Sequence, residues 1–131
     1  MKIGIVSDSL AHLSFSSMLD TAARLGIEGI EINTGNWSSA PHLELAAMLT
    51  TPSAQRDFLK ALADRGLKLI GFNANGNQLH PTDGQRQSKV VNDTIQLAGI
   101  LGVTKICLMS GLPAGGPNDR MPNWVVSIMA A

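Results

Sequence analysis

One short turn recurs three times along this chain, each time between a helical pattern and an apolar run. The three copies read Leu25-Gly26-Ile27-Glu28, Arg65-Gly66-Leu67-Lys68 and Leu101-Gly102-Val103-Thr104. Glycine readily adopts the left-handed backbone conformation that ends a helix, so each copy is expected to lead from a helix into a strand. Repeated helix-to-strand turns are typical of parallel α/β proteins.

The apolar runs and helical patterns alternate over most of the chain. Four such units are half of the eight units in a TIM barrel, which usually needs about 250 residues. We therefore predict an α/β fold in which residues 1–131 form one domain, the amino-terminal half of a TIM barrel with about four of eight (βα) units, truncated where a fifth unit would begin. Strands are predicted at residues 2–6, 28–32, 67–73 and 104–109, and helices at 15–25, 42–49, 53–65 and 84–101, with Ser14 as the first N-cap and Pro52 between the middle helices.

Two other architectures fit the same pattern. A chain of 131 residues also suits an open, doubly wound sheet, which would be a small non-catalytic binding module. Helices on both faces of the sheet would favour that module, whereas helices on one convex face would favour the half barrel. The third possibility is an assembly protein whose free sheet edges recruit a second copy or a separate partner.

The composition limits the classes of partner that the chain is expected to bind. Ten basic and ten acidic residues cancel, so the chain has no overall field to attract nucleic acid or an anionic membrane. Its apolar runs are far shorter than the roughly 20 residues that span a bilayer, and Ser7-Asp8-Ser9 interrupts the first run too early for a signal peptide. We expect a cytoplasmic protein in which the single cysteine, Cys107, is a small buried hydrophobe.

The richest cluster of polar side chains follows the third predicted strand, in the stretch Asn73-Ala74-Asn75-Gly76-Asn77-Gln78-Leu79-His80-Pro81. Amides donate and accept hydrogen bonds without charge, which suits a sugar or polyol. Ligands of parallel α/β proteins bind at the loops that leave the carboxyl ends of strands. Asn73 and Asn75 are therefore candidate ligand contacts, although asparagine also favours turns for purely local reasons.

Three further residues have a structural alternative to a role in binding. His80 could be a metal ligand, a hydrogen-bond donor to a substrate hydroxyl, or a cap for the following helix. Asn33, at the end of the second strand, is a candidate for binding. Glu31, inside that strand, could contact substrate, but it is expected instead to form a structural salt bridge with a basic residue inside the barrel, because an unpaired buried carboxylate is costly. No residue shows the signature of a catalytic nucleophile, and none is assigned a catalytic role.

Three segments together resemble the sugar phosphate isomerase/epimerase family, whose fold is the xylose-isomerase-like TIM barrel and which is distantly similar to the endonuclease IV repair enzymes. These segments are Glu28-Gly29-Ile30-Glu31-Ile32-Asn33, the asparagine-rich stretch ending in His80-Pro81, and Ser110-Gly111-Leu112-Pro113. The resemblance extends to about residue 127 and corresponds to the amino-terminal half of a family member.

The resemblance implies a divalent metal, manganese or magnesium, and proton transfer next to the carbonyl of a keto sugar or sugar phosphate. His80 matches a histidine that binds metal in the endonuclease branch and more often contacts substrate in the isomerases. Ser110 stands where the endonuclease branch has another histidine, and it is carried over as a substrate contact. The family's metal-binding residues and acid/base glutamates come from later strands, so we expect this chain alone to be inactive and to pair as a homo-oligomer.

Overall fold

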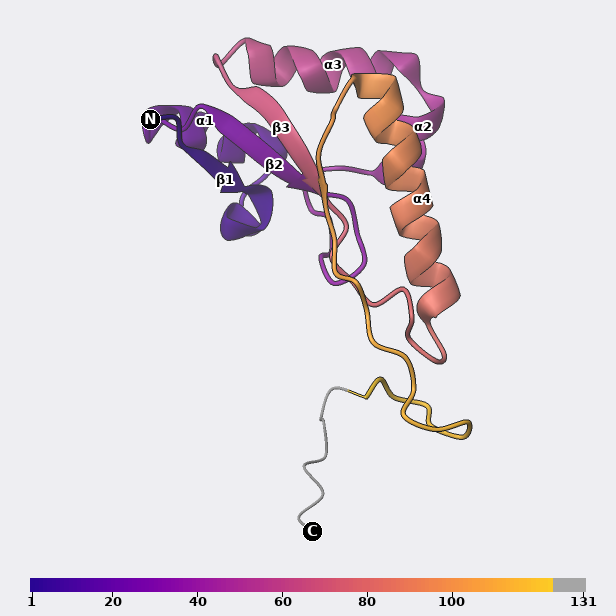
Figure 1. Cartoon of the computed structure of the whole chain (residues 1–131). Coiled ribbons are helices and arrows are strands. Elements are labelled where there is room, and N and C mark those ends of the chain that lie inside the picture. Colours follow the sequence, from indigo (N-terminus) through magenta and orange to yellow (C-terminus); the bar gives the residue numbers. More distant parts are fainter. Residues whose placement is uncertain (124–131) are drawn as a thin grey trace.

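A computed structural model describes residues 1–123 of the chain. Four strands form one parallel sheet in the order β1-β2-β3-β4, with helices in the connections between them (Figure 1). Each strand therefore pairs with its neighbour in sequence, as in a barrel. The elements are β1 (Gly4–Val6), a 3₁₀ turn (Ser7–Leu10), α1 (Phe15–Arg24), β2 (Gly29–Asn33), α2 (Leu45–Thr50), α3 (Pro52–Ala63), β3 (Lys68–Asn73), α4 (Gly84–Leu101) and β4 (Ile106–Cys107).

The order and type of these elements confirm the sequence prediction. The main differences are at the sheet edges, where β1 begins at Gly4 and β4 contains only Ile106–Cys107, shorter than the predicted strands at 2–6 and 104–109. An edge strand has one neighbour instead of two, so fewer backbone hydrogen bonds fix its ends.

Local signals placed the ends of α1, α3 and α4 to within two residues, whereas α2 begins at Leu45 and not at residue 42. The Ser14 hydroxyl accepts a hydrogen bond from the backbone N–H of Ser17 at 3.3 Å and caps α1. The glycines of the recurring turn, Gly26, Gly66 and Gly102, have φ angles of 73°, 69° and 70°. These left-handed values cost glycine little and explain why the same residue ends three connections.

All three long helices pack against one face of the sheet. Ile30 and Ile32 of β2 and Phe72 of β3 have no exposed surface and form the sheet side of the core. The helices supply the other side, through Met18, Leu19, Ala22, Phe58, Leu62, Leu97 and Ala98. Helices on a single face, together with the sequential strand order, support the half barrel and do not match the doubly wound alternative.

The opposite face, which we call the open face, carries Glu31, Ile70, Asn73 and Cys107. A β-bulge shifts the pairing so that Ile30 faces Leu69 and Glu31 faces Gly71, which leaves Ile70 without a partner on β2. Ile70 lies over the glycines of the neighbouring strands, since a Cβ at Gly4 or Gly29 would come within 2.6 Å of its side chain. Its side chain remains 43% exposed, so the helices described here leave this face uncovered.

Cys107 corrects one prediction, because its side chain is exposed and not buried. It lies on an edge strand, and its thiol points to Glu31 on the open face, away from the helices. None of the helices in residues 1–123 combines the length and apolar character needed to cross a bilayer.

Candidate ligand-binding site

The polar residues of β2 and β3 meet at the carboxyl end of the sheet. Asn33 and Asn73 end their strands side by side, as partners in the parallel register. Glu31 precedes Asn33 by two residues, so its side chain lies on the same face of β2. The two strands therefore bring a carboxylate and two amides together at the edge where α/β proteins bind ligands.

Glu31 is held by neutral groups. Its Oε1 accepts a hydrogen bond from Nδ2 of Asn73 at 2.7 Å, and its Oε2 accepts one from the thiol of Cys107 at 3.3 Å. No lysine or arginine within residues 1–123 forms an ion pair with this carboxylate. The predicted salt bridge is therefore wrong: an amide and a thiol from β3 and β4 stabilise Glu31 instead, and the carboxylate keeps its charge available.

The same contact controls the thiol. The hydrogen bond to Glu31 raises the pKa of Cys107, and desolvation and repulsion by the carboxylate act in the same direction. A raised thiol pKa disfavours the thiolate, which is the nucleophilic form. Cys107 is therefore arranged as a hydrogen-bond donor and not as a nucleophile.

Asn33 is buried and forms hydrogen bonds with Ser7, just after β1. The hydroxyl of Ser7 donates to Oδ1 of Asn33 at 3.2 Å and accepts from the backbone N–H of Asn33 at 3.1 Å. No hydrogen bond from Nδ2 of Asn33 is made within the described residues. Asn33 thus has a fixed orientation and a spare amide donor, which fits its predicted binding role.

The asparagine-rich loop divides into structural and available amides. Asn73 is fully engaged, since its Oδ1 also accepts from the backbone N–H of Asn75 at 3.1 Å. Asn77 is 1% exposed and clamps Leu112, donating to its carbonyl at 2.9 Å and accepting from its N–H at 2.8 Å. Asn75 has a half-buried side chain without a hydrogen bond inside residues 1–123. The same is true of Gln78, whose amide nitrogen and oxygen are both buried without a partner there, so these two are the free amides of this loop.

His80 holds the turn just before α4, which is close to the structural alternative of a helix cap, although the bonds of its ring are to residues that precede the helix. Its Nδ1 accepts from the backbone N–H groups of Thr82 at 3.2 Å and Asp83 at 3.1 Å. A neutral imidazole that accepts at Nδ1 carries its proton on Nε2 and has no second lone pair for a metal. His80 is therefore poised to donate a hydrogen bond from Nε2, and it does not fit the role of metal ligand.

His80 lies apart from the group around Glu31. It lines a separate hollow of about 460 Å³ with Gln78 and side chains of α4, and neither Glu31 nor Asn73 borders that hollow. Ser110 is exposed and follows β4, and its neighbour Gly111 lies against Asn77, where an added Cβ would be 2.7 Å from Oδ1. Ser110 thus stays near the carboxyl end of the sheet, but its hydroxyl makes no hydrogen bond to the cluster in the described structure.

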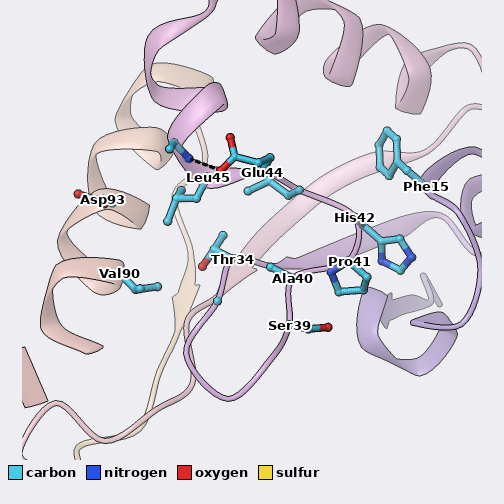
Figure 2. A pocket seen from close by; sticks show the side chains of 13 residues that line it. Phe15, Thr34, Ser39, Ala40, Pro41, His42, Glu44, Leu45, Val90 and Asp93 are labelled. Carbon is cyan, nitrogen blue, oxygen red and sulfur yellow. Dashed lines mark hydrogen bonds between the residues drawn. The ribbon is translucent and has the colours of Figure 1, made fainter. Parts of the chain in front are cut away.

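Sequence reasoning missed a cavity on the helical side of the sheet. This hollow, of about 680 Å³, lies between the connection from β2 to α2 and the helix α4 (Figure 2). His42 borders it and is almost completely buried, at 5% exposure. The only sequence signal was a histidine beside Pro41 at an expected helix start, which does not distinguish a buried side chain from a surface one.

Comparison with known proteins agrees with the sheet topology. No protein-family model matches the chain. The chain is 47% identical over 126 residues to the protein named Uncharacterized protein YfiH of Bacillus subtilis, and the match covers 95% of this chain and 40% of that relative. The crystal structure of the probable 3-DHS dehydratase AsbF of Bacillus anthracis, involved in petrobactin synthesis, superposes with a TM-score of 0.59 at 20% identity, over 85% of this chain and 39% of that one.

The described residues form half of a TIM-barrel-like fold. The chain spans 40% of the curated relative's length, so the likeness concerns a part of that protein and not the whole. At 20% identity, the likeness to AsbF extends to the fold and not to a reaction.

Proposed function

We propose that this chain is the substrate-holding half of a sugar or sugar phosphate isomerase/epimerase. One observation carries the proposal: the Glu31 carboxylate is fixed by Asn73 and Cys107 on the open face, beside the spare amide of Asn33. An uncompensated carboxylate beside amide donors suits the alternating donors and acceptors of a polyhydroxylated ligand. The TIM-barrel-like fold and the resemblance of the asparagine-rich loop support the same ligand class.

Each side chain has a defined part in this proposal. Glu31 accepts a hydrogen bond from a sugar hydroxyl, while Asn33 and Asn75 donate to hydroxyl or carbonyl oxygens. His80 donates from Nε2 to the more distant end of an extended ligand, and Ser110 contacts it from the segment after β4. These contacts are hydrogen bonds that hold and orient the sugar. They do not by themselves transfer a proton.

The divalent metal implied by the family resemblance does not fit these residues. Within residues 1–123, no three side chains of His, Cys, Asp or Glu come together as a metal-binding group, and the His80 ring accepts backbone hydrogen bonds at Nδ1. We therefore derive no step that uses manganese or magnesium. We expect this chain alone to show no isomerase turnover, and turnover of a keto sugar with added Mn²⁺ would contradict that expectation.

Sugar binding is testable on the chain itself. Titration of the ¹⁵N-labelled chain with D-xylulose, and separately with D-xylulose 5-phosphate, is expected to shift the backbone signals of residues 31–33 and 73–77. Asn75→Ala should weaken binding severalfold, because it removes a free amide of the loop. Gln96→Ala, on the exposed side of α4 and away from the hollow beside His80, is the matched control and should leave binding unchanged. Equal binding by both variants would contradict the proposal.

A second candidate function is assembly, in which two half barrels complete each other. The observation that favours it is that, within residues 1–123, the open face is uncovered and β1 and β4 each pair with a single strand. Exposed apolar side chains continue along it and its edges, namely Ile3, Ile70, Leu108 and Met109. The partner in this reading is a second copy of the chain or a separate half barrel, and a nucleic acid or membrane partner is not expected.

The cytoplasmic location stays a prediction.

A further inference from the structure

His42 has a fixed tautomer. The residue lies in the connection between β2 and α2, and its Nε2 is 3.0 Å from the backbone carbonyl oxygen of Leu13. A carbonyl oxygen can only accept, so Nε2 must carry the hydrogen. In the neutral ring, Nδ1 is therefore left with a lone pair and acts only as an acceptor.

This lone pair has no partner in the described residues. Nδ1 of His42 is buried and makes no hydrogen bond there, although the side chain is 5% exposed. Buried polar atoms almost always have a partner, because burial without one is costly. An N–H or O–H donor from outside the chain would therefore be stabilised at this position.

The cavity beside His42 has a consistent chemical character. Its apolar wall includes Phe15, Pro41 and Val90, and its acidic side chains are Glu44 and Asp93 (Figure 2). No lysine or arginine is among the described residues that line it. A phosphate or carboxylate would meet two carboxylates and a lone pair, whereas a cation with an apolar body would meet complementary groups at every wall.

The two carboxylates are already oriented. Glu44 accepts from the backbone N–H groups of Ala46 and Ala47 and so caps α2, as the dashed line in Figure 2 illustrates. Asp93 forms an ion pair with Lys89 on the exposed side of α4. Glu44 has no cationic partner among the described residues and contributes negative charge at the cavity, whereas the charge of Asp93 is offset by Lys89. His42 offers the unused hydrogen-bond acceptor.

We propose that this cavity binds a small organic amine, whose ammonium group donates a hydrogen bond to Nδ1 of His42 and whose apolar body lies against Phe15 and Pro41. The site is on the helical side of the sheet, so it is separate from the sugar site proposed at the open face. Its ligand also differs from a sugar, because it is a cation with an apolar body.

The test is a titration of the full chain with phenethylamine, followed through the side-chain nitrogen signals of His42. Saturable binding that shifts the Nδ1 signal is expected, with 3-phenylpropanoate and 2-phenylethanol binding at least tenfold more weakly. Equal binding of the three probes would overturn the role of positive charge. An Nδ1 signal that does not respond to the amine, as when water alone fills the cavity, would overturn the site.

Two variants separate the site from the fold. His42→Gln places an amide near the position of Nε2, retaining a donor to Leu13 while removing the Nδ1 acceptor, and it should lose binding at least tenfold with an unchanged folded spectrum. Glu44→Gln keeps an oxygen to cap α2 but removes the charge, and it should weaken binding severalfold. This second variant tests the proposal even if His42→Gln fails to fold. Wild-type affinity in the folded His42→Gln protein, or in Glu44→Gln, would contradict the proposal.

Discussion

Glu31 controls the acidity of its neighbour Cys107, an effect that can be measured because the chain has one cysteine. Replacing the carboxylate in Glu31→Gln removes both the strong acceptor and its negative charge, so the raised pKa of the thiol should fall. The thiolate fraction at pH 8, and with it the rate of alkylation by iodoacetamide, is expected to rise severalfold. Glu28→Gln, just before β2, is the control and should leave the rate unchanged. A slower reaction in Glu31→Gln would contradict the assigned contact.

Asp83 gives the fold an acid-dependent contribution at the start of α4. Hydrogen bonds from Arg86 and then Gln87 lower the pKa of Asp83 from 3.8 to about 2. A carboxyl group whose pKa is lowered by folding stabilises the folded state. This contribution is fully present when the pH is above the ordinary pKa of the carboxyl group, and it is lost as the pH falls toward about 2. Asp83→Asn should therefore be less stable than wild type at pH 6, with the two urea midpoints converging near pH 2.

The matched control for this pH dependence is Asp57→Asn on the exposed surface of α3. It should lower the urea midpoint little at pH 6 and change its pH dependence less than Asp83→Asn does. If the midpoints of Asp83→Asn and wild type stay equally far apart down to pH 2, the ion pair with Arg86 is not the source of the acid sensitivity.

At the scale of a single element, the carboxyl end of α4 has one glycine inside the helix and one just after it, and the two should respond oppositely to alanine. Gly102 ends the helix at φ 70°, and an added Cβ would meet nothing within 4 Å, so the cost of Gly102→Ala is conformational alone. We expect about 1 kcal/mol of destabilisation. Gly99 lies inside the helix with the same open surroundings, and Gly99→Ala should stabilise by about 0.5–1 kcal/mol. Chemical denaturation measures the stability of both variants, and a Gly102→Ala variant as stable as wild type would contradict the cap assignment.

Element boundaries were predictable where one residue decides them. Ser14 caps α1, Pro52 begins α3 and Gly102 ends α4, each through a bond or dihedral angle formed within a few residues. The short β4 strand was not predictable in the same way. Its length depends on pairing with β3, which lies more than thirty residues earlier in the sequence.

At the scale of the whole molecule, the open face makes assembly the main expectation. Light scattering after size exclusion should give about twice the 13.8 kDa mass of one chain. Ile70→Lys introduces a charge at the centre of the open face and should convert the dimer to a monomer. Ile95→Lys, at a similarly exposed site on α4, is the control and should remain dimeric. A monomeric wild-type chain would contradict assembly and leave the sugar-binding proposal intact.

The sequence alone determined the succession of strands and helices along the chain, the parallel α/β class and the cluster of amides after β3, but it left open whether the helices cover one face of the sheet or both. These features depend on periodicity, on glycine turns and on the rule that strand ends carry binding loops, all of which are local. The role of each polar side chain was not local. Whether Asn77 binds a ligand or clamps Leu112 depends on a segment 35 residues away.

Only the tertiary structure decided which polar groups are used and which are free. Within the described residues, it paired Glu31 with Asn73 and Cys107 instead of a basic residue, bound Nδ1 of His80 to the turn before α4, and left Nδ1 of His42 unpaired beside a cavity. Hydrogen bonds between strands depend on register, and the bulge at Ile70 changes the register of β3 by one residue. That shift cannot be predicted from the sequence of β3 alone, because it depends on how β3 pairs with β2.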